Sequence, residues 1–91
     1  FQGEPEAALS SLREALRLAP DDPALHRQAA LVSHATGDAD AARRHAQRAI
    51  ELDPGSAAGQ LWLARAELGL EHLSQARAAA ERARTLAPGE P

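Results

Sequence analysis

Three kinds of side chain in this 91-residue sequence could support catalysis or metal binding: histidine, serine and the carboxylates. The histidines and serines are His26, His34, His45 and His72, and Ser10, Ser11, Ser33, Ser56 and Ser74. No two histidines lie four residues apart, which is the spacing that places two metal ligands on one side of a helix. None of the serines lies in a nucleophile-elbow motif, and no glycine-rich phosphate loop is present. The sequence therefore predicts no enzyme, no metal site and no cofactor.

Composition excludes further classes of function. The ten basic residues are all arginine, which we attribute to the base composition of a bacterial genome, and thirteen acids oppose them. A net charge of -3 favours neither nucleic acid nor an anionic membrane as a partner. Cysteine is absent, and no apolar run approaches the ~20 residues that a membrane span needs. We expect a soluble chain; its compartment stays open, with the cytoplasm favoured.

The positions of proline and alanine show an internal repeat of 34 residues. Three prolines end nearly the same sequence segment, and two sets of alanines recur at the same interval: Pro20, Pro54 and Pro88; Ala8, Ala42 and Ala76; Ala15, Ala49 and Ala83. Within each repeat the two alanines stand seven residues apart, on one face of a helix. Repeats of this length are typical of a solenoid, in which helical hairpins bury their apolar faces by stacking.

Capping and turn residues predict where the helices begin and end. Asp22 is an N-cap followed by proline, and Gly37-Asp38 combines a turn glycine with an N-cap. Ser56 caps the next helix, after a break at Pro54-Gly55. The acidic residues at these ends are explained by capping, so they need no catalytic role. We predict five helices, over residues 5–18, 23–36, 39–52, 57–69 and 73–86.

The repeat resembles the tetratricopeptide repeat (TPR), a 34-residue helix-turn-helix unit. Residues 23–56 and 57–90 resemble full units, and residues 3–22 resemble the second half of one, so we predict an all-α superhelix of about two and a half hairpins. The family's aromatic positions hold other residues here: His26, Ser33 and Ala46, then Gln60, Glu67 and Ala80. Glu71 also replaces the turn glycine found as Gly37. We therefore expect a thinner core than is usual for the family.

The leading half-unit implies an array that once extended further toward the N-terminus. Phe1-Gln2-Gly3 has two interpretations, the remnant of an engineered protease site or the end of a native repeat helix. Without a partner helix, the apolar stripe formed by Leu9, Leu12 and Leu16 would be less covered than in a longer array. Self-association through this stripe is one expected consequence.

The resemblance implies that the first helix of each unit lines a concave groove able to hold a peptide or a partner helix. The implied inward positions are Ala24, Arg27, Gln28, Leu31, His34 and Ala35, then Ala58, Leu61, Trp62, Arg65, Leu68 and Gly69. Trp62 is either a binding hot spot or a residue that fills space left by the missing aromatics. Arg27 and Arg65 either pair with a partner's carboxylates or are merely solvated.

These positions favour a protein-interaction module. Leu31 stands where family members that grip a chain's terminal carboxylate need asparagine, so we expect no such clamp. Leu31, Leu61, Trp62 and Leu68 beside two arginines instead predict a partly apolar, acidic partner segment. Two alternatives stay open: a scaffold that self-associates or joins neighbouring domains, and a passive spacer within a larger protein.

Overall fold

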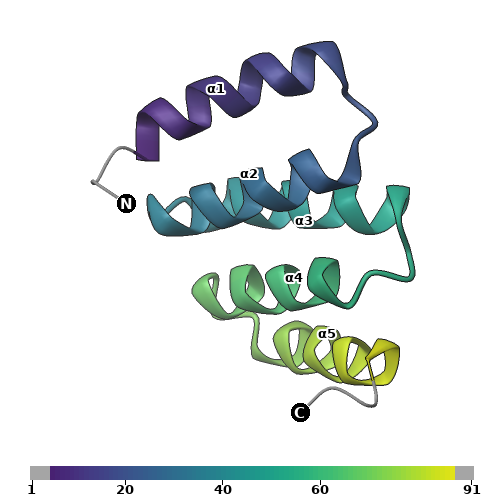
Figure 1. The fold of residues 1–91 in the computed structure, drawn as a ribbon. Coiled ribbons are helices and arrows are strands. Elements are labelled where there is room, and N and C mark those ends of the chain that lie inside the picture. The colour runs from purple at the N-terminus through teal and green to yellow at the C-terminus, as the bar shows by residue number, and fades with distance from the viewer. Residues whose placement is uncertain (1–4, 88–91) are drawn as a thin grey trace.

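The computed structural model describes residues 5–87, and this part of the chain folds into five α-helices without a strand (Figure 1). The helices are α1 (Pro5–Leu18), α2 (Pro23–Ala35), α3 (Ala39–Leu52), α4 (Ala57–Gly69) and α5 (Leu73–Leu86). The predicted all-α class is confirmed. Four helices have the predicted bounds, and α2 ends one residue earlier than predicted.

Three of the helices begin at a side-chain cap. Asp22 accepts a hydrogen bond from the backbone N–H of Ala24 at 2.9 Å, and Asp38 accepts one from Ala41 at 3.0 Å. Ser56 Oγ accepts one from the N–H of Gly59 at 3.1 Å. Each cap satisfies an amide that has no partner within its helix, which is why the helices begin at these residues.

The end of α2 differs from the prediction because Thr36 caps the helix. Its backbone N–H donates to the carbonyl of Val32, and its Oγ1 donates to the carbonyl of Ser33 at 2.8 Å. Gly37 follows with φ of 85°, a left-handed conformation that glycine adopts without steric cost. Glu71 holds the equivalent place 34 residues later with φ of 63°, so this turn is strained where the first is not.

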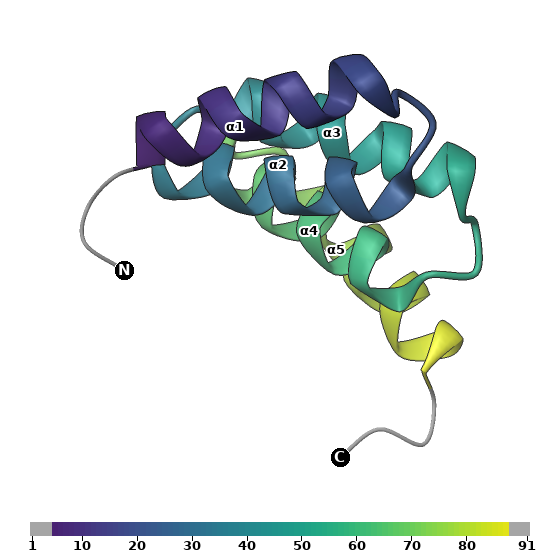
Figure 2. The ribbon, with the colours of Figure 1, turned by 45° about the horizontal axis from the view of Figure 1, so that its top comes forward.

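The helices stack in the order of the sequence (Figures 1 and 2). Helices α2 and α3 form one hairpin, and α4 and α5 form the second. The hairpins pack together through α3 and α4, while α2 also contacts α4. Helix α1 lies at one end of the stack, where α2 is the only described helix that it contacts. The first helices of the two hairpins are therefore neighbours on one side of the molecule.

Small residues let the helices approach closely. The core cluster consists of Ala30, Ala46, Leu63, Ala64 and Ala79, with Ile50, Trp62 and Ala80 packed against it. Between α3 and α4, a methyl group added at Gly59 would lie 3.1 Å from Ile50 Cγ1, and one added at Gly69 would lie 3.2 Å from Ala39 Cβ. At such spacing the neighbouring side chain would have to move by a few tenths of an ångström to accept even a methyl group at either glycine. The stability of the stack thus depends on many small contacts.

Four buried residues stand where the resemblance would place aromatics: Ala46 is apolar, and the other three are polar. Gln60 accepts a hydrogen bond from Arg82 Nε at 3.1 Å, and Glu67 lies 2.7 Å from His72 Nδ1. Ser33 is fully buried, and its hydroxyl has no hydrogen-bond partner. Two of the three sites are thus satisfied by side chains of the following helix and turn, and one is not.

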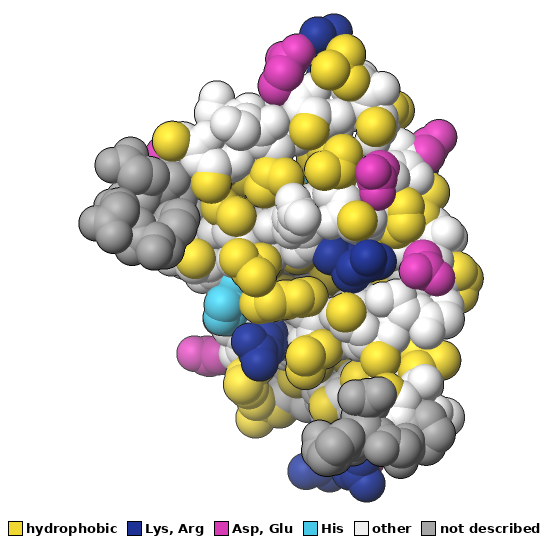
Figure 3. Space-filling view, in the orientation of Figure 1, with side chains coloured by type: hydrophobic (Ala, Val, Ile, Leu, Met, Phe, Trp, Pro, Cys, Tyr) yellow, Lys and Arg dark blue, Asp and Glu magenta, His cyan; other side chains and the backbone are white. Residues whose placement is uncertain are grey.

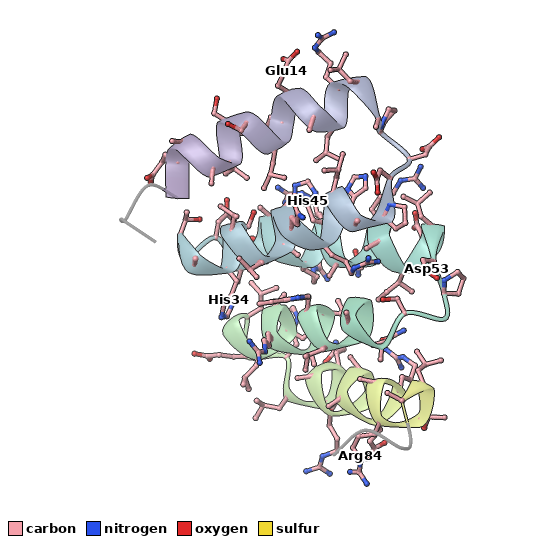
Figure 4. The ribbon with its side chains drawn as sticks, viewed as in Figure 1. Glu14, His34, His45, Asp53 and Arg84 are labelled. Atoms are coloured by element: carbon pink, nitrogen blue, oxygen red, sulfur yellow. The ribbon has the colours of Figure 1, made fainter. Side chains whose placement is uncertain are left out.

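Two histidines connect the turn between α1 and α2 with helices α2 and α3. His26 Nε2 lies 2.8 Å from the carbonyl oxygen of Pro20, and its Nδ1 lies 3.3 Å from Nδ1 of His45 (labelled in Figure 4). Burial lowers the pKa of His45 below its ordinary value of 6.5, and the nearby charges of His26, Arg44 and Arg13 lower it further. Burial and these neighbouring charges together favour the uncharged form of His45.

Candidate binding surface

The exposed side chains of α2 and α4 form one continuous face. Figure 3 shows hydrophobic side chains gathered there beside basic ones. Equivalent positions of the two helices carry different chemistry, in the pairs Arg27 and Leu61, Gln28 and Trp62, Leu31 and Arg65, and His34 and Leu68. Among them, Leu31 is 46% exposed and Leu68 is 59% exposed. The face therefore combines apolar side chains with polar and cationic ones.

Trp62 is the centre of a small cluster on this face. Its ring is half-buried and packs against the core. The guanidinium carbon of Arg65 lies 4.9 Å from the ring centroid, and the His34 ring meets the indole edge-on with centroids 6.0 Å apart. Figure 4 shows His34 extending from α2 toward α4. Trp62 thus packs as one of the two sequence interpretations expected, and it also holds Arg65 at the surface.

The two arginines of the face have different surroundings. Arg65 is exposed and stacks on Trp62. Arg27 is half-buried, and its Nη1 lies 3.7 Å from a carboxylate oxygen of Asp53, in the turn between α3 and α4. That nitrogen is buried and makes no hydrogen bond to any described residue. Arg27 is thus partly engaged within the molecule, whereas Arg65 presents its charge to solvent.

Two of the positions expected to point inward also lie next to other helices. A methyl group added at Gly69 would lie 3.2 Å from Ala39 Cβ, at the contact between α3 and α4. The close packing of these two helices favours a small residue there. Leu61 is 42% exposed, but it lines a pocket between α4 and α5 together with Ala58 and residues of α5. It thus borders this pocket as well as the face.

The part of the chain that the structure describes contains no group of three or more histidine, cysteine, aspartate or glutamate side chains able to hold a metal ion. The pairs that do form, His26 with His45 and His72 with Glu67, were not foreseen from the sequence. The first pair joins residues 19 apart on different helices, so no local pattern could have indicated it. No helix within residues 5–87 is both long and apolar enough to cross a membrane.

Comparison with known protein families agrees with the repeat seen in the structure. One tetratricopeptide repeat model matches residues 1–57, and a second matches residues 33–91. No curated protein matches the chain. The two matches together span the whole sequence, and the hairpins that they cover have the stacked arrangement described above. The chain belongs to the tetratricopeptide repeat family.

Proposed function

We propose that the face formed by α2 and α4 binds an extended peptide or a helix of a partner protein. Tetratricopeptide repeats are generally protein-interaction modules and are typically not catalytic. The residues proposed to contact the partner are Arg27, Gln28, Leu31, His34, Leu61, Trp62, Arg65 and Leu68. The observation that carries this proposal is the exposure of Leu31 and Leu68 on the same face as the cluster of Trp62, Arg65 and His34.

The same side chains indicate the chemistry of the partner. Leu31 and Leu68 offer apolar area that is now in contact with water, and covering it contributes roughly 25 cal/mol for each Å² removed. Arg65 is held by its stacking on Trp62, so it loses little conformational freedom when it binds a carboxylate. A segment with leucine-like side chains and an acidic residue between them fits both features.

Affinity capture from the native host with immobilised protein tests this proposal. We expect the wild-type protein to retain a partner that the double variant Leu31→Ser, Arg65→Glu loses. One substitution removes apolar area from the face and the other reverses a charge. Both side chains are exposed, so the fold should be retained. Truncation of Trp62 is less informative, since its ring packs on the core and its loss would also destabilise the fold.

The matched control is Arg44→Glu, which makes the same charge change at an exposed position of α3. It should retain every partner. A partner recovered equally by the wild type and by the double variant would show that binding does not use this face. A peptide from a captured partner should also shift the emission of Trp62, the single tryptophan of the chain.

A scaffold that self-associates is the alternative function that the end position of α1 favours. Leu9, Leu12 and Leu16 are only half-buried there, and Leu18 is 71% exposed. Sedimentation over a concentration series distinguishes the two functions. A strict monomer would contradict self-association, whereas a dimer lost in Leu12→Ser would support it.

A further inference from the structure

A second pocket lies among α3, α4 and α5, and none of the residues proposed for the face of α2 and α4 lines it. Its volume is about 520 Å³, which is within the usual range for small-ligand sites. The lining residues are Gln47, Ile50, Glu51, Gln60, Leu63 and Arg82. We call it the Gln60 pocket, because this side chain connects its other parts.

The Gln60 pocket does not depend on the outer surface of α5 being open. Arg48 is the counterpart of Arg82 on the first hairpin, where α4 packs on α3. Its side chain nevertheless stays 44% exposed. A helix that packed on α5 in the same way would therefore leave Arg82 accessible.

A polar residue replaces an aromatic one at the base of this pocket. Gln60 stands where the resemblance would place an aromatic ring, and it is only 7% exposed. Because glutamine is smaller than an aromatic side chain, it leaves space that a ring would fill. Leu63 is buried and Ile50 is half-buried, so they add apolar surface to the same pocket. The pocket thus combines an apolar wall with a buried amide.

The contact between Gln60 and Arg82 leaves donors free on both side chains. Arg82 Nε donates to Gln60 Oε1 at 3.1 Å, which fixes the guanidinium against a buried partner. No carboxylate of a described residue lies within salt-bridge distance of Arg82. The amide nitrogen of Gln60 likewise donates to no described residue. These donors suit a carboxylate, and little conformational freedom is lost when a guanidinium already held in place binds one.

Glu51 limits the charge that such a ligand can carry. It lines the same pocket and accepts a hydrogen bond from Arg48 Nη1 at 3.0 Å. A ligand with a second negative charge would meet this carboxylate and be repelled. The charges of the pocket therefore favour a single carboxylate.

We propose that the Gln60 pocket binds a small organic acid that carries one carboxylate and a short apolar chain. The carboxylate accepts hydrogen bonds from the Nη groups of Arg82 and from the amide of Gln60, and the chain lies against Ile50 and Leu63. This site goes beyond the function proposed above. The two share no residue, so either can fail without the other.

Three probes of similar size test the chemistry of the ligand: 4-methylpentanoate, its neutral amide 4-methylpentanamide, and the dicarboxylate glutarate. Titrations are followed by NMR through the methyl signals of Ile50 and Leu63 and the side-chain amide of Gln60. We expect 4-methylpentanoate to shift these signals with a Kd of about 1 mM. The amide should bind about tenfold more weakly, because it lacks the charge, and glutarate about threefold more weakly.

Substitution of Arg82 tests its role against a matched arginine of the same helix. Arg82→Gln should remove the tenfold preference for the acid over the amide. Arg84→Gln makes the same change at an exposed residue outside the pocket, which extends away from the stack in Figure 4, and should keep the preference. Gln60→Phe should fill the pocket and abolish binding, with circular dichroism to check the fold. If this variant does not fold, Arg82→Gln decides, because Arg82 is exposed.

Four results would overturn the proposal. Equal binding of the acid and the amide, or an equal loss in Arg82→Gln and Arg84→Gln, would show that Arg82 does not select a carboxylate. Tighter binding of glutarate would refute the part given to Glu51. Shifts confined to Leu31 and Leu68 would place the acid on the face of α2 and α4 instead.

Discussion

Replacing Ser33 with alanine should stabilise this protein, against the usual direction of core substitutions. Ser33 is the largest side chain in the described residues that is fully buried, and its hydroxyl makes no hydrogen bond. Folding therefore strips water from a polar group without replacing it. The cost of such an unsatisfied buried group is about 1–3 kcal/mol. Removing the hydroxyl removes this cost.

Two smaller effects adjust the magnitude. Alanine has a better helix propensity than serine by roughly 0.5 kcal/mol, and Ser33 lies inside α2. The loss of one oxygen removes a few dispersion contacts of about 0.1–0.2 kcal/mol each. The expected net gain is about 1.5 kcal/mol, which for a chain of this size raises Tm by roughly 6–12 °C.

Thermal and urea unfolding followed by circular dichroism would measure this gain. Ser11→Ala is the matched control, because Ser11 is exposed on α1 and its hydroxyl is solvated. The control should report helix propensity alone, with a gain of no more than about 0.5 kcal/mol. An unchanged or lower stability for Ser33→Ala would show that the hydroxyl has a partner, such as a bound water, and would refute the reasoning.

Four further predictions concern the contact of His72 with Glu67, the turns at Gly37 and Glu71, and the burial of His45. His72→Ala should destabilise the fold by about 2 kcal/mol in urea unfolding, because it leaves the buried carboxylate of Glu67 without its hydrogen bond; an unaltered midpoint would contradict that pairing. Gly37→Ala should cost about 1–2 kcal/mol in the same assay, since its φ of 85° is unfavourable for any side chain. Glu71→Gly should instead stabilise by about 0.5 kcal/mol, because relief of the strained φ exceeds the added entropy of the unfolded chain, and a loss of stability would argue against strain there. Finally, the folded pKa of His45 lies below the ordinary 6.5, so between these two values the unfolded chain binds more protons than the folded one. The free energy of unfolding should therefore fall as the pH drops through 6.5, and the contribution of His45 should become constant below its folded pKa. The fall should be shallower in His45→Gln. Equal pH profiles for the two proteins would contradict the assignment of this effect to His45.

The candidate surface was only partly predictable from the sequence. Spacing alone places residues 27, 31 and 34 on one helix face, and their counterparts 61, 65 and 68 on another, so this grouping could be predicted from the sequence. The residues that surround these side chains could not be predicted. The contact of Arg65 with Trp62 joins neighbouring turns of one helix, but the approach of His34 to the same ring depends on how α2 and α4 pack.

The sequence by itself determined the repeat, the helices and most of their ends. These features follow from local causes: Asp22, Asp38 and Ser56 satisfy the first amides of their helices, and alanines at a 34-residue period permit close packing. Local hydrogen bonds and backbone preferences act within a few residues, so they are visible in a linear pattern.

Only the tertiary structure decided which side chains meet between elements. It paired Arg82 with Gln60 across 22 residues, placed Gly69 against Ala39, and placed Leu61 beside a pocket between α4 and α5. Periodicity identifies the face of a helix on which a residue lies, whereas the neighbour of that face depends on the distance and angle between helices. Those quantities result from the packing of all the side chains together, so no single repeat contains them.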